Sequence, residues 1–164
     1  MPINNVIEGD LIKLALEGRY DAIAHGCNIY CTMGSGIAPQ IAEAFPMARF
    51  VDDMTQSGEK AKLGTTTACV AELTHLEGKD NYIIVHNLYT QAEFGNPANG
   101  SHNVNYKAIV SCFRFLNDCY KDSDVLLGIP QIGAGLAKGH WEAIETIINL
   151  VTPDLDIELV MYKP

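Results

Sequence analysis

The sequence predicts an α/β fold, a three-layer α/β/α sandwich with a mixed, mainly parallel sheet of about six strands. Short apolar runs alternate along the chain with longer amphipathic segments, as strands and helices do in such folds. Two β-compatible runs, 64–73 and 81–88, are separated only by a short turn, which predicts one antiparallel pair. Two glycine-rich stretches each follow an apolar run and precede an expected helix. The length of 164 residues suits one domain, so we expect a single domain over 1–164.

The N-terminal part of the chain is expected to contain two strands and three helices. Asp10 has a side chain that caps helix N-termini, and Gly18 ends the short helix that follows. Tyr20–His25 is short and apolar, which is typical of a buried strand. Pro46 is expected to end the first of two further helices, because proline cannot continue a helix. The expected ranges are strands 3–7 and 20–25 and helices 11–16, 37–45 and 48–55.

The remaining chain is expected to contain four strands and two helices. Ile109, Cys112, Phe113 and Leu116 follow the spacing of one helix face, and this helix has the strongest periodicity in the chain. Pro153 is expected to end the last helix. The expected ranges are strands 64–73, 81–88, 125–129 and 157–162 and helices 104–120 and 141–151.

Two stretches of small residues are candidate anion-binding loops. They comprise Gly34, Ser35, Gly36, Ile37 and Ala38 in one place and Gly133, Ala134, Gly135 and Leu136 in another. Glycine lets a backbone approach a phosphate closely, and the start of a helix adds unpaired N–H groups. In open α/β sheets ligands bind beyond the carboxyl ends of the strands, where both stretches are expected. The sequence therefore predicts a diphosphate clamp, and the alternative is two ordinary tight turns.

The composition excludes several classes of function. The formal net charge of −9 argues against broad nucleic-acid binding, which needs a basic surface. No apolar run approaches the ~20 residues of a membrane-spanning helix, so we expect no membrane partner. The N-terminus has no basic stretch followed by an apolar one, so we expect a cytoplasmic protein.

The five cysteines are expected to be free thiols that bind no metal. Their odd number and scattered spacing favour reduced side chains. His25, Cys27 and Cys31 have the spacing H-x-C-x3-C, which lacks a fourth ligand and matches no standard zinc pattern. We therefore expect neither a metal ion nor a cofactor.

Four segments, in their order and spacing, carry a resemblance to a known family. Val6–Leu11 resembles its opening strand and turn, and Ile23–Asn28 resembles its second strand. Cys31–Ala38 and Ile129–Leu136 resemble its two phosphate loops. The family is the macro domain, an ADP-ribose-binding fold, and the resemblance covers nearly the whole chain.

The resemblance implies roles for individual residues. Asp10 would accept a hydrogen bond from the adenine amino group, with the N–H of Leu11 nearby, although Asp10 also suits a plain helix cap. The two glycine-rich stretches would hold the diphosphate, and Asn28 would bind the distal ribose. Tyr162 would flank the adenine, and its alternative is an aromatic residue of the core. The sequence leaves open whether the protein has a protein partner.

The phrase H-x-C-N, which ends at Asn28, is similar to one branch of the family. This branch includes yeast-type ADP-ribose 1″-phosphate phosphatases and enzymes that remove ADP-ribose from acidic side chains. In the phosphatases a histidine of this phrase acts, which corresponds here to His25; the alternative is a core histidine. The second group has a catalytic aspartate where this chain has Ala137, and its lysine has no match in 89–103.

The expected function is therefore binding of ADP-ribose with hydrolysis of ADP-ribose 1″-phosphate. His25 and Asn28 are the expected catalytic residues, because a histidine exchanges protons near neutral pH. Two alternatives remain: a module that binds ADP-ribose without turnover, and a hydrolase that removes ADP-ribose from acidic side chains.

Overall fold

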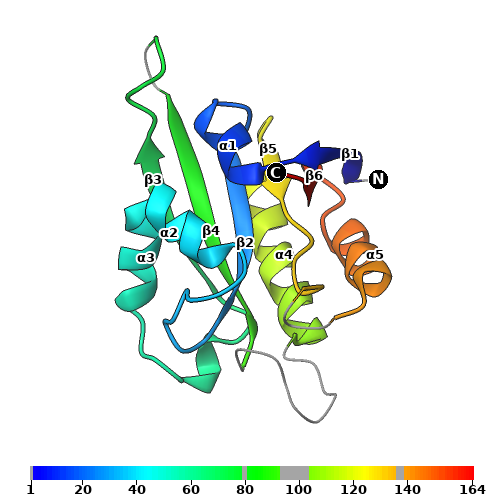
Figure 1. The fold of residues 1–164 in the computed structure, drawn as a ribbon. Coiled ribbons are helices and arrows are strands. Elements are labelled where there is room, and N and C mark those ends of the chain that lie inside the picture. Colours follow the sequence, from blue (N-terminus) through cyan, green and yellow to red (C-terminus); the bar gives the residue numbers. More distant parts are fainter. Residues whose placement is uncertain (1, 79–80, 93–103, 136–138) are drawn as a thin grey trace.

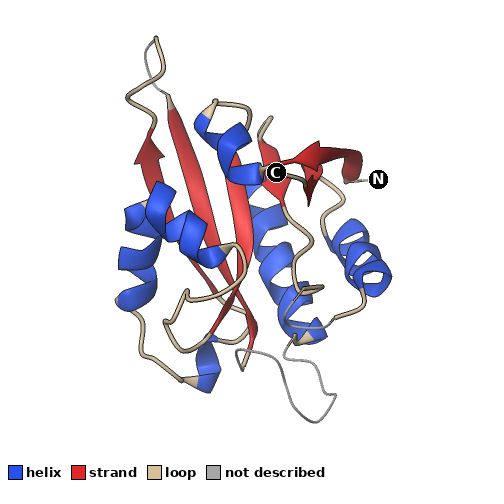
Figure 2. Ribbon diagram, viewed as in Figure 1, coloured by secondary structure: helices blue, strands red, loops and turns tan. Residues whose placement is uncertain are grey.

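A computed structural model describes residues 2–78, 81–92, 104–135 and 139–164 of the chain. A six-stranded sheet forms its centre, and helices cover both faces of this sheet (Figure 1, Figure 2). The strands are β1 (Ile3–Gly9), β2 (Ala22–Asn28), β3 (Thr66–Glu72), β4 (Tyr82–Gln91), β5 (Leu126–Ile129) and β6 (Asp156–Tyr162). The helices are α1 (Leu11–Leu16), α2 (Ala38–Ala44), α3 (Pro46–Asp53), α4 (Tyr106–Tyr120) and α5 (Trp141–Val151), with a 3-10 turn η1 (Lys60–Lys62).

The sheet has the order β1-β6-β5-β2-β4-β3. All neighbouring strands are parallel except β3 and β4, which form the expected antiparallel pair. The prediction of a mixed, mainly parallel sheet between helix layers is thus confirmed. Because β5 and β2 are neighbours, the segments that follow them leave the sheet side by side.

Each face of the sheet has its own apolar core. On one face, Phe113 of α4 and Ile144 of α5 are fully buried against the strands. On the other face, Ile41 of α2 and Ala48 of α3 pack on Ile23 and its neighbours. Burial on both faces explains why the parallel strands read as nearly continuous apolar runs.

The helix boundaries differ from expectation at Pro46. This residue begins α3 rather than only ending α2, because proline fits the first turn, where its missing N–H is not needed. The face of α3 that packs on the sheet carries Ala48 and Asp52, whereas Phe50 and Met54 are exposed. The β4 strand also continues to Gln91, beyond the predicted end at 88.

One ionic cluster connects the edge of the sheet to its interior. The buried Glu158 of β6 accepts hydrogen bonds from Arg19 Nε (2.7 Å) and Tyr20 Oη (2.5 Å). Asn5 of β1 donates a further bond to it. These bonds join β1, β6 and the segment before β2.

Among the described residues, no helix is long and apolar enough to cross a membrane.

Candidate functional site

The carboxyl ends of the parallel strands surround a cavity of about 750 Å³. This volume lies within the range of small-molecule sites. The cavity is lined by the following residues from the predicted site: Asp10, Leu11, Asn28, Gly34, Ser35, Gly36, Ile37, Ala38, Gly133, Ala134, Gly135 and Tyr162. Leu136, which was also predicted to hold the diphosphate, lies outside the described residues. The structure therefore brings the two glycine-rich stretches together in one wall.

The order of the strands spreads these residues along the edge of the sheet. Asp10 follows β1, and Tyr162 ends β6. The second glycine-rich stretch follows β5, the first follows β2, and Gln91 ends β4. A ligand in the cavity thus meets Asp10 at one end, the glycine-rich stretches in the middle, and Gln91 at the other end.

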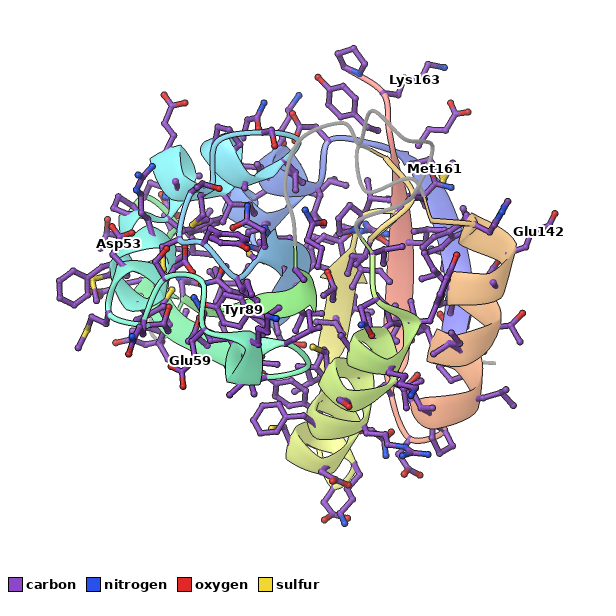
Figure 3. The ribbon with its side chains drawn as sticks, turned by 90° about the horizontal axis from the view of Figure 1, so that it is seen from below. Asp53, Glu59, Tyr89, Glu142, Met161 and Lys163 are labelled. Carbon is purple, nitrogen blue, oxygen red and sulfur yellow. The ribbon has the colours of Figure 1, made fainter. Side chains whose placement is uncertain are left out.

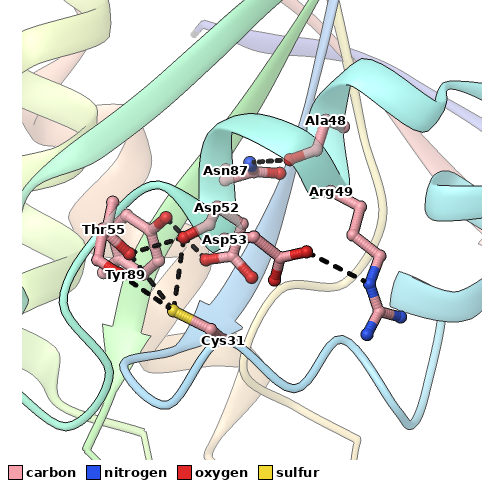
Figure 4. A network of polar contacts seen from close by, with 8 residues as sticks. All are labelled: Cys31, Ala48, Arg49, Asp52, Asp53, Thr55, Asn87 and Tyr89. Carbon is pink, nitrogen blue, oxygen red and sulfur yellow. Dashed lines mark hydrogen bonds and ion pairs between the residues drawn. The ribbon is translucent and has the colours of Figure 1, made fainter.

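The loop after β2 has an unusual backbone. Cys31 (φ 58°) and Met33 (φ 37°) are in the left-handed region, which costs about 1 kcal/mol or more for residues other than glycine. Contacts hold this conformation: the Cys31 thiol donates to Asp52 O at 3.2 Å, and Lys62 Nζ donates to Ile29 O at 2.9 Å. Figure 4 shows the thiol beside the end of α3. These contacts therefore fix the loop to α3 and η1.

The glycines of the two stretches serve different needs. Gly36 (φ 64°) is required for its positive φ and not for lack of space, since a Cβ there would meet no atom within 4 Å. Gly133 (φ 77°) is required for conformation and space, since a Cβ would lie 2.8 Å from Val104 Cγ2. Gly135 lines the cavity in open space.

The cavity has no cationic side chain in its wall among the described residues, because neither Lys nor Arg contributes to it. Its carboxylates are Asp10, Glu43 and Asp52. Ile37, at the start of α2, makes no side-chain cap bond. An anion would therefore be held by backbone N–H groups, which bind phosphates at such helix starts.

Asp10 and Tyr162 occupy the same end of the cavity. Asp10 caps α1, because its Oδ1 accepts from the N–H groups of Ile12 (3.0 Å) and Lys13 (3.2 Å). It also lines the cavity, so the capping role and the ligand role coexist. Tyr162 is 77% exposed, so the alternative of a core aromatic is wrong.

His25 does not belong to the wall of the cavity. Its side chain is fully buried, and its Nε2 lies 2.7 Å from Asn87 Oδ1. Burial lowers the pKa of His25 to about 4. The prediction that His25 acts directly on a ligand is corrected by this placement: its strand directs it into the core beneath the cavity.

Cys27 lies between His25 and the cavity. Its sulfur is 3.6 Å from Nε2 and 3.8 Å from Nδ1 of His25, so it does not lie in line with either ring nitrogen. Burial raises the pKa of the Cys27 thiol well above its usual value. With the imidazole and the thiol both neutral, the two do not form an activated nucleophile.

Asp52 was missed by the sequence analysis. It is 1% exposed and lines the cavity, and Tyr89 Oη donates to its Oδ1 at 2.7 Å. Burial raises the pKa of this carboxyl group. The available signal was the spacing of Ala48 and Asp52, which places an acidic residue on the face of α3 that packs inward. Gln91, at the end of β4, also lines the cavity.

Within the described parts of the chain, no cluster of three histidine, cysteine or acidic side chains could hold a metal ion.

Comparison with known proteins defines the class. No family model matches the chain. It is 24% identical to human ADP-ribose glycohydrolase OARD1, over 95% of this chain and 88% of that protein. A macrodomain protein from Streptomyces coelicolor superposes with a TM-score of 0.68, at 20% identity and 98% coverage of both chains. The DarTG protein of Thermosipho africanus, solved in complex with ADP-ribose, superposes with a TM-score of 0.71 at 19% identity. The superposition covers all of this chain but only 43% of the DarTG chain.

The fold is that of the solved macrodomains. The chain is 34% identical to the 17.5 kDa protein in the tk–vs intergenic region of Enterobacteria phage T4. The match covers 96% of each chain. The chain belongs to the family of this phage protein.

Proposed function

We propose that this protein binds ADP-ribose and hydrolyses ADP-ribose 1″-phosphate to ADP-ribose and phosphate in the cytoplasm. The observation that supports this most strongly is one cavity that contains Asp10, both glycine-rich stretches and Asn28. The name of OARD1 and the ADP-ribose bound to DarTG give independent support for this ligand.

The order of residues along the cavity suggests how the ligand lies. Adenine lies at Asp10, with Tyr162 beside it. The diphosphate lies across the backbone N–H groups of the two stretches. The distal ribose lies at Asn28, whose Nδ2 already donates to Thr32 Oγ1 at 2.7 Å and has a second hydrogen for a ribose hydroxyl.

A second candidate is a hydrolase that removes ADP-ribose from acidic side chains. The relationship to a glycohydrolase favours it. The end of the cavity at Gln91, however, carries no lysine among its described residues, and this group of enzymes is expected to need one. We therefore rank the phosphatase first.

Two measurements on the purified protein test the proposal. Calorimetry is expected to show ADP-ribose binding with a Kd in the micromolar range, about −8 kcal/mol. Phosphate release from ADP-ribose 1″-phosphate, compared with ADP-ribose release from a peptide modified on glutamate, identifies the substrate. Binding without release from either substrate would leave a non-catalytic module, and absence of binding would refute the proposed ligand.

A further inference from the structure

Asp52 forms the floor of the cavity at the end opposite Asp10. It contacts Tyr89, which lies two residues before Gln91 on β4. Its charge also contributes to the raised pKa of Cys27 at the end of β2, so the two side chains are close. Both β2 and β4 lie far from β1 in the sheet order. The carboxylate is thus at the distal-ribose end.

A chain of hydrogen bonds leads from Asp52 back into the core. Tyr89 Oη lies 3.0 Å from Thr67 Oγ1, and Asn87 Nδ2 donates to the same Thr67 oxygen at 3.0 Å. Because an ionised carboxylate can only accept hydrogen bonds, the Tyr89 hydroxyl donates to Asp52. The hydroxyl of Thr67 must therefore donate to Tyr89. The Asn87 oxygen then accepts from His25 Nε2. Every donor in this chain points toward Asp52.

We propose that Asp52 is the general base of this cavity and holds the water that attacks the phosphate ester at the distal ribose. The inference rests on the proposed hydrolysis. A carboxylate has about four acceptor positions, and Tyr89 uses one of them. The bond from Tyr89 fixes the orientation of the carboxylate, as a general base requires.

The reaction follows in two proton transfers. The water oxygen bonds to phosphorus while one water proton passes to Asp52. The bond between phosphorus and the 1″ oxygen, on the side of phosphorus opposite the attacking water, breaks, and the ribose oxygen receives the proton from Asp52 through solvent. The products are ADP-ribose and phosphate, and Asp52 returns to its ionised form. His25 has only a positioning role in this scheme, through Asn87.

Asp53 provides a matched control for a substitution of Asp52. It is the next residue on α3, its side chain is 50% exposed, and it forms an ion pair with Arg49 (3.7 Å). Figure 3 shows Tyr89 inside the molecule and Asp53 at its edge, and Figure 4 shows Asp53 directed to Arg49. One helix thus presents one carboxylate to the cavity and one to solvent.

The first experiment compares Asp52→Asn with Asp53→Asn. We expect Asp52→Asn to lower kcat for ADP-ribose 1″-phosphate by about 100-fold or more, with a Kd for ADP-ribose within threefold of wild type. Asp53→Asn should leave both constants unchanged. A kcat for Asp52→Asn within threefold of wild type would overturn the inference, as would a wild-type protein that binds ADP-ribose but releases no phosphate. Absence of ADP-ribose binding would instead refute the proposed function itself.

The second experiment uses the pH profile of kcat, and it does not require the Asp52 variant to fold. The groups that face the carboxylate are Tyr89 and Lys62, which lower its pKa, and Asp53 and Arg49 of the same helix, which act in opposite directions. Tyr89→Phe removes a hydrogen bond to the ionised form. It should therefore move the acidic limb of the profile upward by about one pH unit, with ADP-ribose binding unchanged. An unshifted limb would contradict the role of Asp52.

Discussion

At the scale of single residues, the wall of the cavity combines residues of local motifs with Asp52, which comes from the inner face of α3. Asp10 and the glycines were predicted because their motifs are local, and a local motif can be recognised in the sequence without the structure. His25 was placed at the ligand because its motif resembles that of the phosphatases, yet the alternation of β2 directs its ring into the core. Asp52 has no motif, and only the packing of α3 brings it to the cavity.

Gly135→Val tests the second glycine-rich stretch. The new side chain would point into open space, since a Cβ at this position meets no atom within 4 Å. The fold should therefore survive, while the branched side chain occupies the place of the diphosphate. We expect ADP-ribose to bind about 100-fold more weakly, a loss of about 2.7 kcal/mol, by calorimetry.

The control for this variant is Thr74→Val, which introduces the same residue on an exposed turn. It should change neither the melting temperature nor the affinity. If Gly135→Val binds ADP-ribose as wild type does, the diphosphate does not lie on this stretch.

At the scale of elements, the strands and helices were predictable, but the inward face of α3 was not. Its apolar residues Phe50 and Met54 face solvent, while Asp52 is buried. Hydrophobic periodicity assumes that apolar side chains face the core. This assumption fails at Asp52, because this part of the inner face of α3 meets the buried polar groups of Tyr89 and Lys62, whereas Ala48 on the same face packs on the apolar core.

Glu158→Gln tests the ionic cluster that joins β1 to β6. The hydrogen bonds from Arg19 and Tyr20, with that from Asn5, hold the pKa of Glu158 at about 2. The variant removes a charged acceptor, so we expect a loss of about 2 kcal/mol in the free energy of unfolding, measured in urea at pH 7.

The pH dependence gives a second measure of the same cluster. Because the folded pKa of Glu158 lies below its unfolded value of 4.5, its contribution is complete above pH 4.5 and is lost as the pH falls toward 2. The difference between wild type and Glu158→Gln should shrink over this interval. A difference that stays constant between pH 5 and pH 3 would contradict an ionised Glu158 in the cluster.

At the scale of the whole molecule, the order of the apolar runs was enough to predict the layers and the single antiparallel pair. The sheet order was not predictable, because nothing local in β5 specifies that it lies beside β2. That adjacency is what places the two glycine-rich stretches in one cavity. The resemblance to the macro domain had already implied that the two glycine-rich stretches lie together.

The folded protein should lose stability in mild acid. Burial lowers the pKa of both His25 and His86 to about 4, so each stays neutral in the folded state while it binds a proton when unfolded. The contribution of these two histidines to stability is therefore constant above about pH 6.5 and falls as the pH drops from 6.5 to 4, by up to about 2.7 kcal/mol per pH unit for two protons. Urea unfolding at pH 7, 6 and 5 measures this slope.

His86→Phe should halve this slope, because it removes one of the two protons taken up on unfolding. Among the described residues His86 Nδ1 has no partner, but Nε2 is hydrogen-bonded to Tyr120 Oη, so the variant is expected to be less stable at every pH and the slopes alone are compared. A slope equal to that of wild type would show that His86 is already protonated in the folded state.

The proposed binding of a diphosphate in a cavity whose described wall has no cationic side chain, in a chain of net charge −9, has a consequence for binding kinetics. The protein and a diphosphate repel each other at long range, and dissolved ions screen this repulsion over about 8–10 Å at ordinary ionic strength. Added sodium chloride should therefore speed the association of ADP-ribose, whereas it slows association at sites built from lysine and arginine. The short-range contacts to backbone N–H groups lie inside the cavity and are screened far less. We therefore expect the protein to bind its nucleotide best at high ionic strength. Other phosphate compounds should not be attracted to the protein at long range and should interact with it only inside the cavity.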